Sequence, residues 1–164
     1  MTDSGDVTRP PAAAREPPLD RLATRRWSPA RAEALEKLGY LPGVVEEFVY
    51  LALDAAPSDT VAIVVRRLRI PHRTLSRQVS AAGLAAPHLI LRACRLLKAG
   101  FILIFERTTV ERTAERIGFA KAATMRRHLM EDFGVLPSTL RTPGGVYLWP
   151  DIIKAFVKVV VLAV

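Results

Sequence analysis

The segment from 87 to 105 constrains the fold more than any other, because it is apolar almost all the way round a helix. Only His88, Arg92, Arg95 and Lys98 interrupt the apolar surface, and they form a narrow stripe. A helix on a protein surface shows one apolar stripe, whereas a helix that is apolar on all sides is buried from several directions. We therefore expect a long central helix against which the other elements pack.

Two pairs of short helices flank this central helix in the sequence. The apolar periodicity predicts helices over 60–68 and 72–80 before it, and over 110–117 and 121–132 after it. Each pair has a short helix, a turn of three or four residues and a second helix rich in arginine, which is the outline of a helix-turn-helix unit. No segment shows the alternation typical of a strand. The sequence therefore predicts an all-α fold, in which two helix-turn-helix units, each a homeodomain-like three-helical unit, are joined by the long central helix.

Local signals at the second pair support this prediction. Thr108 and Glu111 have capping-box spacing, and Thr109 offers an alternative N-cap one residue later. Gly118 can adopt the left-handed conformation that a tight turn between the two helices requires. The helix that follows carries one apolar stripe, formed by Met125, Leu129 and Phe133.

The flanking segments differ in composition from the central region. The first residues are rich in proline among Ala, Arg, Asp and Ser, which predicts a disordered N-terminal tail. Ser28 and Pro29 form a helix start and Gly39 a stop, so a short helix is expected over 29–38, and a second over 44–55. The expected division is a tail at 1–27, N-terminal helices at 28–58, a double helix-turn-helix region at 59–141 and an apolar extension at 142–164.

All of the excess positive charge lies in the central region. Residues 59–141 contain fifteen Lys or Arg and six Asp or Glu, a net charge of +9, whereas the rest of the chain carries −1. A module that binds a polyanion needs such a concentration of positive charge to release counterions from phosphates. Double-stranded DNA is therefore an expected partner, although a basic surface without a partner and an acidic membrane surface fit the charge as well.

The chain offers no constellation for catalysis or metal binding. Cys94 is the only cysteine, so neither a disulfide nor a cysteine-based metal site can form within the chain, and we expect a small core residue there. His72, His88 and His128 fall on separate predicted elements, and there is no nucleophile elbow or phosphate loop. We therefore expect no enzyme activity and no cofactor.

The apolar C-terminus is too short to cross a bilayer. Residues 152–164 number thirteen and include Lys154 and Lys158, which falls short of a membrane span. The N-terminus is broken by prolines and lacks the apolar stretch of a signal peptide. We expect a cytoplasmic, nucleoid-associated protein that does not insert into membranes.

The run from about 59 to 141 resembles the C-terminal DNA-binding domain of AraC/XylS-type regulators. The likeness is most extensive in TVERTAERIGFAKAATMRRHLMEDFGVLPSTLR, at 109–141, which follows the second-unit pattern of that family without gaps. RLLKAGFIL, at 95–103, matches the connecting helix of the family. RTLSRQVSAAGLAAP, at 73–87, resembles the first recognition helix and the turn after it.

Some positions depart from the family pattern. In the first unit Val65 stands where a small Ala is usual, Pro71 replaces the usual Ser cap, and Arg69 falls in the turn. In the second unit Thr113 stands where Ile is common. The resemblance is therefore stronger for the central helix and the second unit than for the first unit.

The resemblance implies that one recognition helix from each unit enters the major groove, and that the units address successive turns on one face of the duplex. By position, the first helix is expected to present Arg73, Ser76 and Arg77 to base edges, with Thr74 or His72 near phosphate. The second is expected to present Ala122, Ala123, Thr124 and Arg127, flanked by Lys121 and Arg126. We expect the second unit to read fewer hydrogen-bonded positions, because alanines and a threonine methyl offer only apolar contact. A local alternative for Arg127 is an ion pair with Glu131, four residues on.

The implied function is that of a sequence-specific transcription factor, with RNA polymerase as a further partner. The alternative is a protein-interaction or membrane-associated module that derives from this fold but does not read DNA. The family often carries a sensing domain, but the 58 residues before the first unit are too few and too interrupted by proline to form one. We therefore expect no small-molecule effector domain, and expect the chain to be either a stand-alone reader or a truncated relative.

The extension at 142–164 is compatible with helix and, being rich in Val, with strand. It can be a docked helix, an interface without its partner, or an exposed apolar segment.

Overall fold

The computed structural model of the protein describes the backbone of residues 19–162 and the side chains from Arg26 onward. Residues 1–18, which make up most of the expected tail, lie outside the described residues, as do 163–164. The described part of the chain is helical and contains no strand, which confirms the predicted all-α class. Its elements are α1 (Leu19–Leu38), α2 (Gly43–Leu53), α3 (Val61–Arg67), α4 (His72–Ala81), α5 (Pro87–Phe101), a π-helical turn η1 (Ile102–Glu106), α6 (Val110–Ile117), α7 (Ala122–Phe133), α8 (Pro137–Leu140), a 3-10 segment η2 (Pro143–Leu148) and α9 (Trp149–Val160).

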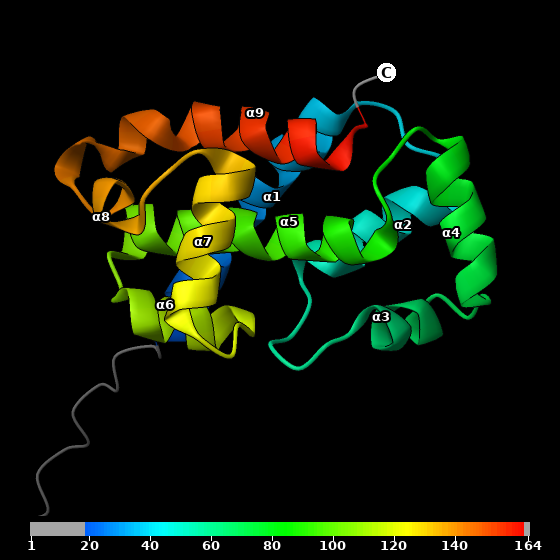
Figure 1. Ribbon diagram of the computed structural model, residues 1–164, viewed down its shortest axis with the longest axis horizontal. Coiled ribbons are helices and arrows are strands. Elements are labelled where there is room, and N and C mark those ends of the chain that lie inside the picture. Colours follow the sequence, from blue (N-terminus) through cyan, green and yellow to red (C-terminus); the bar gives the residue numbers. More distant parts are fainter. Residues whose placement is uncertain (1–18, 163–164) are drawn as a thin grey trace, which may run out of the picture.

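The helix α5 lies at the centre of the molecule, as its apolar sequence predicted. Figure 1 shows it running through the middle of the structure, with α3 and α4 near one end and α6 and α7 near the other. Ile90, Leu96 and Leu97 are fully buried. Cys94 is buried as well, and burial raises the pKa of its thiol far above the ordinary range, so the thiol stays protonated. This confirms the expected role of the cysteine as a small core residue.

The three long cations of α5 each meet a partner on a different element. The Nε atom of Arg92 lies 3.0 Å from Oδ2 of Asp132 on α7. The Nζ atom of Lys98 lies 6.0 Å from the ring centre of Trp27 on α1. Arg95 bonds to the loop before α3, as described below. The polar stripe of α5 therefore joins the central helix to its surroundings and does not face solvent alone.

The helix α1 begins earlier than its sequence suggested. We expected Ser28 and Pro29 to open a helix after a tail, but the segment 19–27 is already helical and Pro29 lies inside α1. Trp27 is only 6% exposed, and its ring lies 5.3 Å from that of Phe101 in an edge-on arrangement. A proline inside a helix removes a backbone hydrogen bond, so the local sequence favours a helix that starts at Pro29. The packing of Trp27 against Phe101 compensates for the lost hydrogen bond. The expected start of this helix at Pro29 was therefore wrong.

The C-terminal extension is a helix docked on the domain, one of the three arrangements that the sequence left open. Figure 1 shows α9 running alongside α5. Ile152 and Phe156 are fully buried, and a Cβ atom added at Gly100 of α5 would lie 3.2 Å from Cγ2 of Ile152, so the two helices approach closely there. The last turn binds to the loop after α4, because the amide of Ala85 donates to the carbonyl of Val160 over 2.8 Å. None of the described helices combines the length and apolar composition that a membrane crossing requires.

We predict that Phe156→Ala destabilises the whole domain, because it empties a site in the core shared by α5 and α9. The expected loss is about 3–5 kcal/mol in the free energy of unfolding, measured by urea denaturation. Tyr147→Ala is the matched control, because the Tyr147 side chain is 83% exposed, and it should change the stability by less than about 0.5 kcal/mol. Similar losses in the two variants would show that α9 is not docked.

Candidate nucleic-acid interface

The first helix-turn-helix unit consists of α3 and α4. Thr60 caps α3, because the amide of Ile63 donates to its Oγ1 atom over 3.4 Å. Val65, Leu75 and Val79 are buried and fix α4 against the rest of the unit. The opposite side of α4 therefore faces solvent. On it, Arg73 and Arg77 are exposed, and Thr74 and Ser76 are partly exposed.

The second unit consists of α6 and α7, and α6 has the bounds that its sequence predicted. Thr109 is its N-cap and accepts a hydrogen bond from the amide of Arg112 over 3.3 Å, so the alternative cap is the one used and Thr108 is not. Thr113 is fully buried, and its hydroxyl donates to the carbonyl of Thr109 over 2.8 Å. Threonine therefore stands where Ile is common in the family without leaving its buried hydroxyl unpaired.

The helix α7 buries the predicted stripe and exposes its cations. Met125, Leu129 and Phe133 are all buried, which confirms the expected apolar face. The residues expected to face DNA lie on the rest of its surface: Lys121, Ala123, Arg126 and Arg127 are exposed, and Ala122 and Thr124 are partly exposed. In Figure 1, α4 and α7 lie toward opposite ends of α5 and run in the same direction in that view.

The two units differ in the turn between their helices. Gly118 ends α6 in the left-handed conformation, with φ 84°. Arg69 holds the corresponding place after α3, with φ 54°, although it carries a side chain. A left-handed conformation costs a residue with a Cβ atom roughly 1–2 kcal/mol. The turn of the first unit is therefore strained at Arg69, and the side chain of Arg69 is exposed.

A short loop before α3, residues 56–59, is held by an ion pair between the buried carboxylate of Asp59 and the exposed side chain of Arg67. Asp59 is only 4% exposed, and its carboxylate accepts two hydrogen bonds from Arg67, over 2.6 and 2.9 Å, and one from the amide of Ala56 over 2.8 Å. The hydrogen bonds from Arg67 lower the pKa of Asp59, against an opposing effect of burial. Since the folded pKa lies below the unfolded value, this stabilisation is present at neutral pH and lost as the pH falls below about 4.

The same loop touches both the central helix and the second unit. The Nη2 atom of Arg95 donates to the carbonyls of Ala56, Pro57 and Asp59. A Cβ atom added at Gly118 would lie 2.1 Å from the carbonyl oxygen of Pro57, so the turn of the second unit rests directly on the loop. The loop 56–59 therefore connects the first unit, α5 and the second unit at one point.

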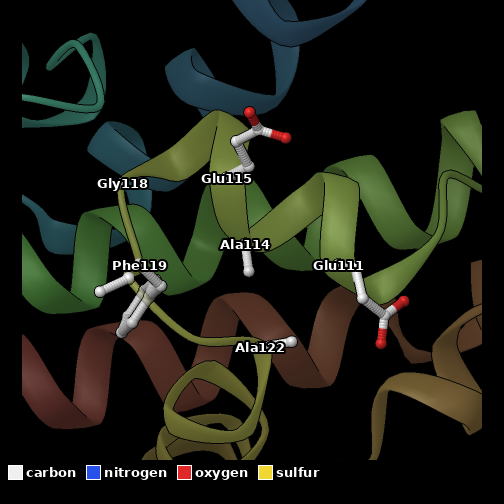
Figure 2. A pocket seen from close by; sticks show the side chains of 7 residues that line it. Glu111, Ala114, Glu115, Gly118, Phe119 and Ala122 are labelled. Carbon is white, nitrogen blue, oxygen red and sulfur yellow. The ribbon is translucent and has the colours of Figure 1, made fainter.

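An open pocket lies between α6 and the start of α7. Figure 2 shows Glu111 and Glu115 on α6, one turn apart, with Ala114 between them and Ala122 at the start of α7 opposite. Phe119, from the turn, lines the same pocket. Its rim is acidic, so it does not suit an anionic ligand. No group of three or more possible metal-ligating side chains occurs in the described part of the chain.

The cations of the two units are partnered differently. Nη2 of Arg126 lies 2.8 Å from Oε1 of Glu111, and Nε of Arg127 lies 3.8 Å from Oε1 of Glu131. The local alternative for Arg127 is therefore realised in the structure. On α4, Arg73 has no ion pair within the described residues, and the same is true of the other cation there, Arg77.

Comparison with known proteins identifies this region. A family model described as a helix-turn-helix domain matches residues 64–142, from within α3 to just after α8. Residues 64–142 form an AraC/XylS-type helix-turn-helix domain. The AraC-type domain makes the protein a DNA-binding transcription regulator in the general sense of that family. Neither a curated protein nor a solved structure matches the chain.

We predict that Gly118→Ala destabilises the AraC-type domain by more than its backbone strain. A left-handed alanine costs about 1–3 kcal/mol, and the new Cβ atom must also displace the backbone of Pro57. Gly134→Ala is the control, because Gly134 has φ 68° but nothing within 4 Å of an added Cβ atom. Urea denaturation should show a larger loss for Gly118→Ala. Equal losses would contradict the contact with the loop 56–59.

We also predict that Arg69→Gly stabilises the domain, by about 0.5–1 kcal/mol, because glycine adopts the left-handed conformation without strain. Arg66→Gly is the control, because it removes the same kind of side chain from an exposed position inside α3. Glycine disfavours a helix, so this change should instead destabilise the domain by about 1 kcal/mol. Both changes are measured by thermal and urea denaturation. Destabilisation by Arg69→Gly would show that the first turn does not hold the left-handed residue.

Proposed function

We propose that the AraC-type domain binds specific duplex sites by placing α4 and α7 in successive segments of the major groove, and that it regulates transcription from these sites. One observation supports this most directly. Two helices with exposed arginines lie toward opposite ends of a single buried helix and run in the same direction in Figure 1. A buried connector keeps the separation of the reading helices fixed, as a site of two half-sites on one face of the duplex requires.

The proposed base contacts follow the exposed side of each helix. On α4, Arg73 and Arg77 take guanine through two hydrogen bonds each, Ser76 contacts a neighbouring base, and Thr74 contacts phosphate. On α7, Ala122 and the methyl group of Thr124 contact thymine, and Arg127 reads guanine when it leaves Glu131. Lys121 and Arg126 flank these positions and contact phosphates.

The rest of the chain supports this reader. The segment 59–141 reads DNA, and the flanking segments 28–58 and 142–164 pack against it, since α1, α2 and α9 all contact α5. The bound regulator acts through RNA polymerase as its protein partner. It works on chromosomal DNA, in the cytoplasm at the nucleoid.

Arg77→Ala should weaken binding to the specific site by about 5- to 150-fold, because one bidentate contact with guanine is worth about 1–3 kcal/mol. The specific site is first selected from a library of random duplexes, and affinities are then measured by fluorescence anisotropy on that site and on a scrambled duplex. The loss on the scrambled duplex should be smaller, because only charge is removed there.

Arg26→Ala is the matched control, because Arg26 is an exposed arginine of α1 outside the reader. It should leave the specific affinity within about twofold of the starting protein, in line with a change far from the interface. Equal losses in the two variants would contradict the assignment of Arg77. No affinity for any duplex at low salt would contradict DNA reading itself and favour a protein-interaction module.

A further inference from the structure

The recognition helix of the first unit carries its positive charge without an ion-pair partner among the described residues, although Arg67 on α3 pairs with Asp59. No Asp or Glu occurs between Asp59 and Glu106, although this stretch includes all of α3, α4 and α5. Arg73 and Arg77 on α4 are exposed, and neither has an ion pair among the residues described. Both guanidinium groups are therefore available for phosphates and bases.

The second unit carries as many cations but surrounds them with acids. Glu111 on α6 pairs with Arg126, and the two side chains are 68% and 50% exposed. Glu131 pairs with Arg127 one turn away on α7, and its other oxygen lies 3.5 Å from Nδ1 of His128. Each arginine of this recognition helix thus has a carboxylate of its own protein as its nearest charged partner.

We infer that the two units divide the work of binding: the first anchors the domain to DNA, and Glu111 and Glu131 act as specificity-determining residues that restrain the second. This rests on the proposed function. A phosphate competes with Glu111 for Arg126, and the carboxylate repels the phosphate. An exposed ion pair is weak, so a well-matched site displaces the carboxylate whereas random DNA does so poorly. The second unit then engages mainly at correct sites.

The test of Glu111 is a double-mutant cycle with Arg126. Glu111→Gln should raise the affinity for random duplex DNA by about two- to fivefold, because the carboxylate no longer competes with phosphate. In an Arg126→Ala background the same change should have almost no effect. Affinity is measured by fluorescence anisotropy at several salt concentrations, and thermal melts check that each variant is folded.

Glu115→Gln is the matched control. Glu115 lies one turn from Glu111 on the rim of the same pocket, is exposed, and has no ion pair in the part of the chain that the structure describes. A gain for Glu111→Gln that exceeds the gain for Glu115→Gln and disappears without Arg126 supports the inference. Equal gains, a gain that persists without Arg126, or no gain at all would overturn it.

The anchoring role of the first unit is tested by salt dependence. On random DNA, where no guanine is matched to them, Arg73 and Arg77 contact phosphates instead of base edges. Each phosphate contact contributes about 0.9 to the slope of log affinity against log salt, so replacing both arginines by Ala should lower this slope on random DNA by about 1.8. Replacing both Arg126 and Arg127 by Ala should lower it by less than half as much. Equal reductions would overturn the division of work. Failure of the unaltered protein to bind any duplex would instead contradict the proposed function, so the two failures are distinguishable.

Discussion

The arrangement of the two helix-turn-helix units depends on the hydrogen bonds by which Arg95 holds the loop 56–59. A guanidinium group half-covered by its surroundings binds three backbone carbonyls at once, which fixes this loop on the central helix. Asp59 secures the loop to the first unit through Arg67, and Pro57 supports the turn of the second unit at Gly118. The units are also connected through α5 and through α9, which contacts α7 and bonds to the loop after α4. Without the junction at the loop 56–59, their relative orientation would be set less tightly.

A central helix that is apolar on nearly all sides needs cover from several elements, and the chain supplies it from both ends. The N-terminal helix α1 brings Trp27 to one side of α5, and α9 brings Ile152 and Phe156 to another. Trp149, the first residue of α9, connects α9 to α1, because its ring lies against Phe101 and its Nε1 atom donates to Glu33 on α1. The segments that flank the AraC-type domain in sequence are therefore part of its hydrophobic core.

The sequence predicted the elements well where the physics is local. Apolar periodicity and a capping threonine predicted α6 with its correct bounds, and the stripe at Met125 predicted the buried face of α7. The start of α1 was wrong because the packing of Trp27 outweighs the local preference of Pro29. The form of the C-terminus could not be decided, because β-branched residues favour strand while contact with α5 favours helix. Likewise, the pair Arg127–Glu131 follows from helical spacing, whereas the pair Arg126–Glu111 depends on how α6 and α7 pack.

The departures from the family pattern affect the two units in different ways. Val65 is 4% exposed and fits the core of the first unit, so a larger side chain there does not disturb its packing. Thr113 satisfies its hydroxyl within its own helix. The turn at Arg69 is the departure that carries strain, and it also adds an exposed cation to the unit whose recognition helix has no ion pair among the described residues. The unit with the weaker resemblance is thus the one whose recognition-helix arginines have no ion pair among the described residues, and its turn combines backbone strain with an added positive charge.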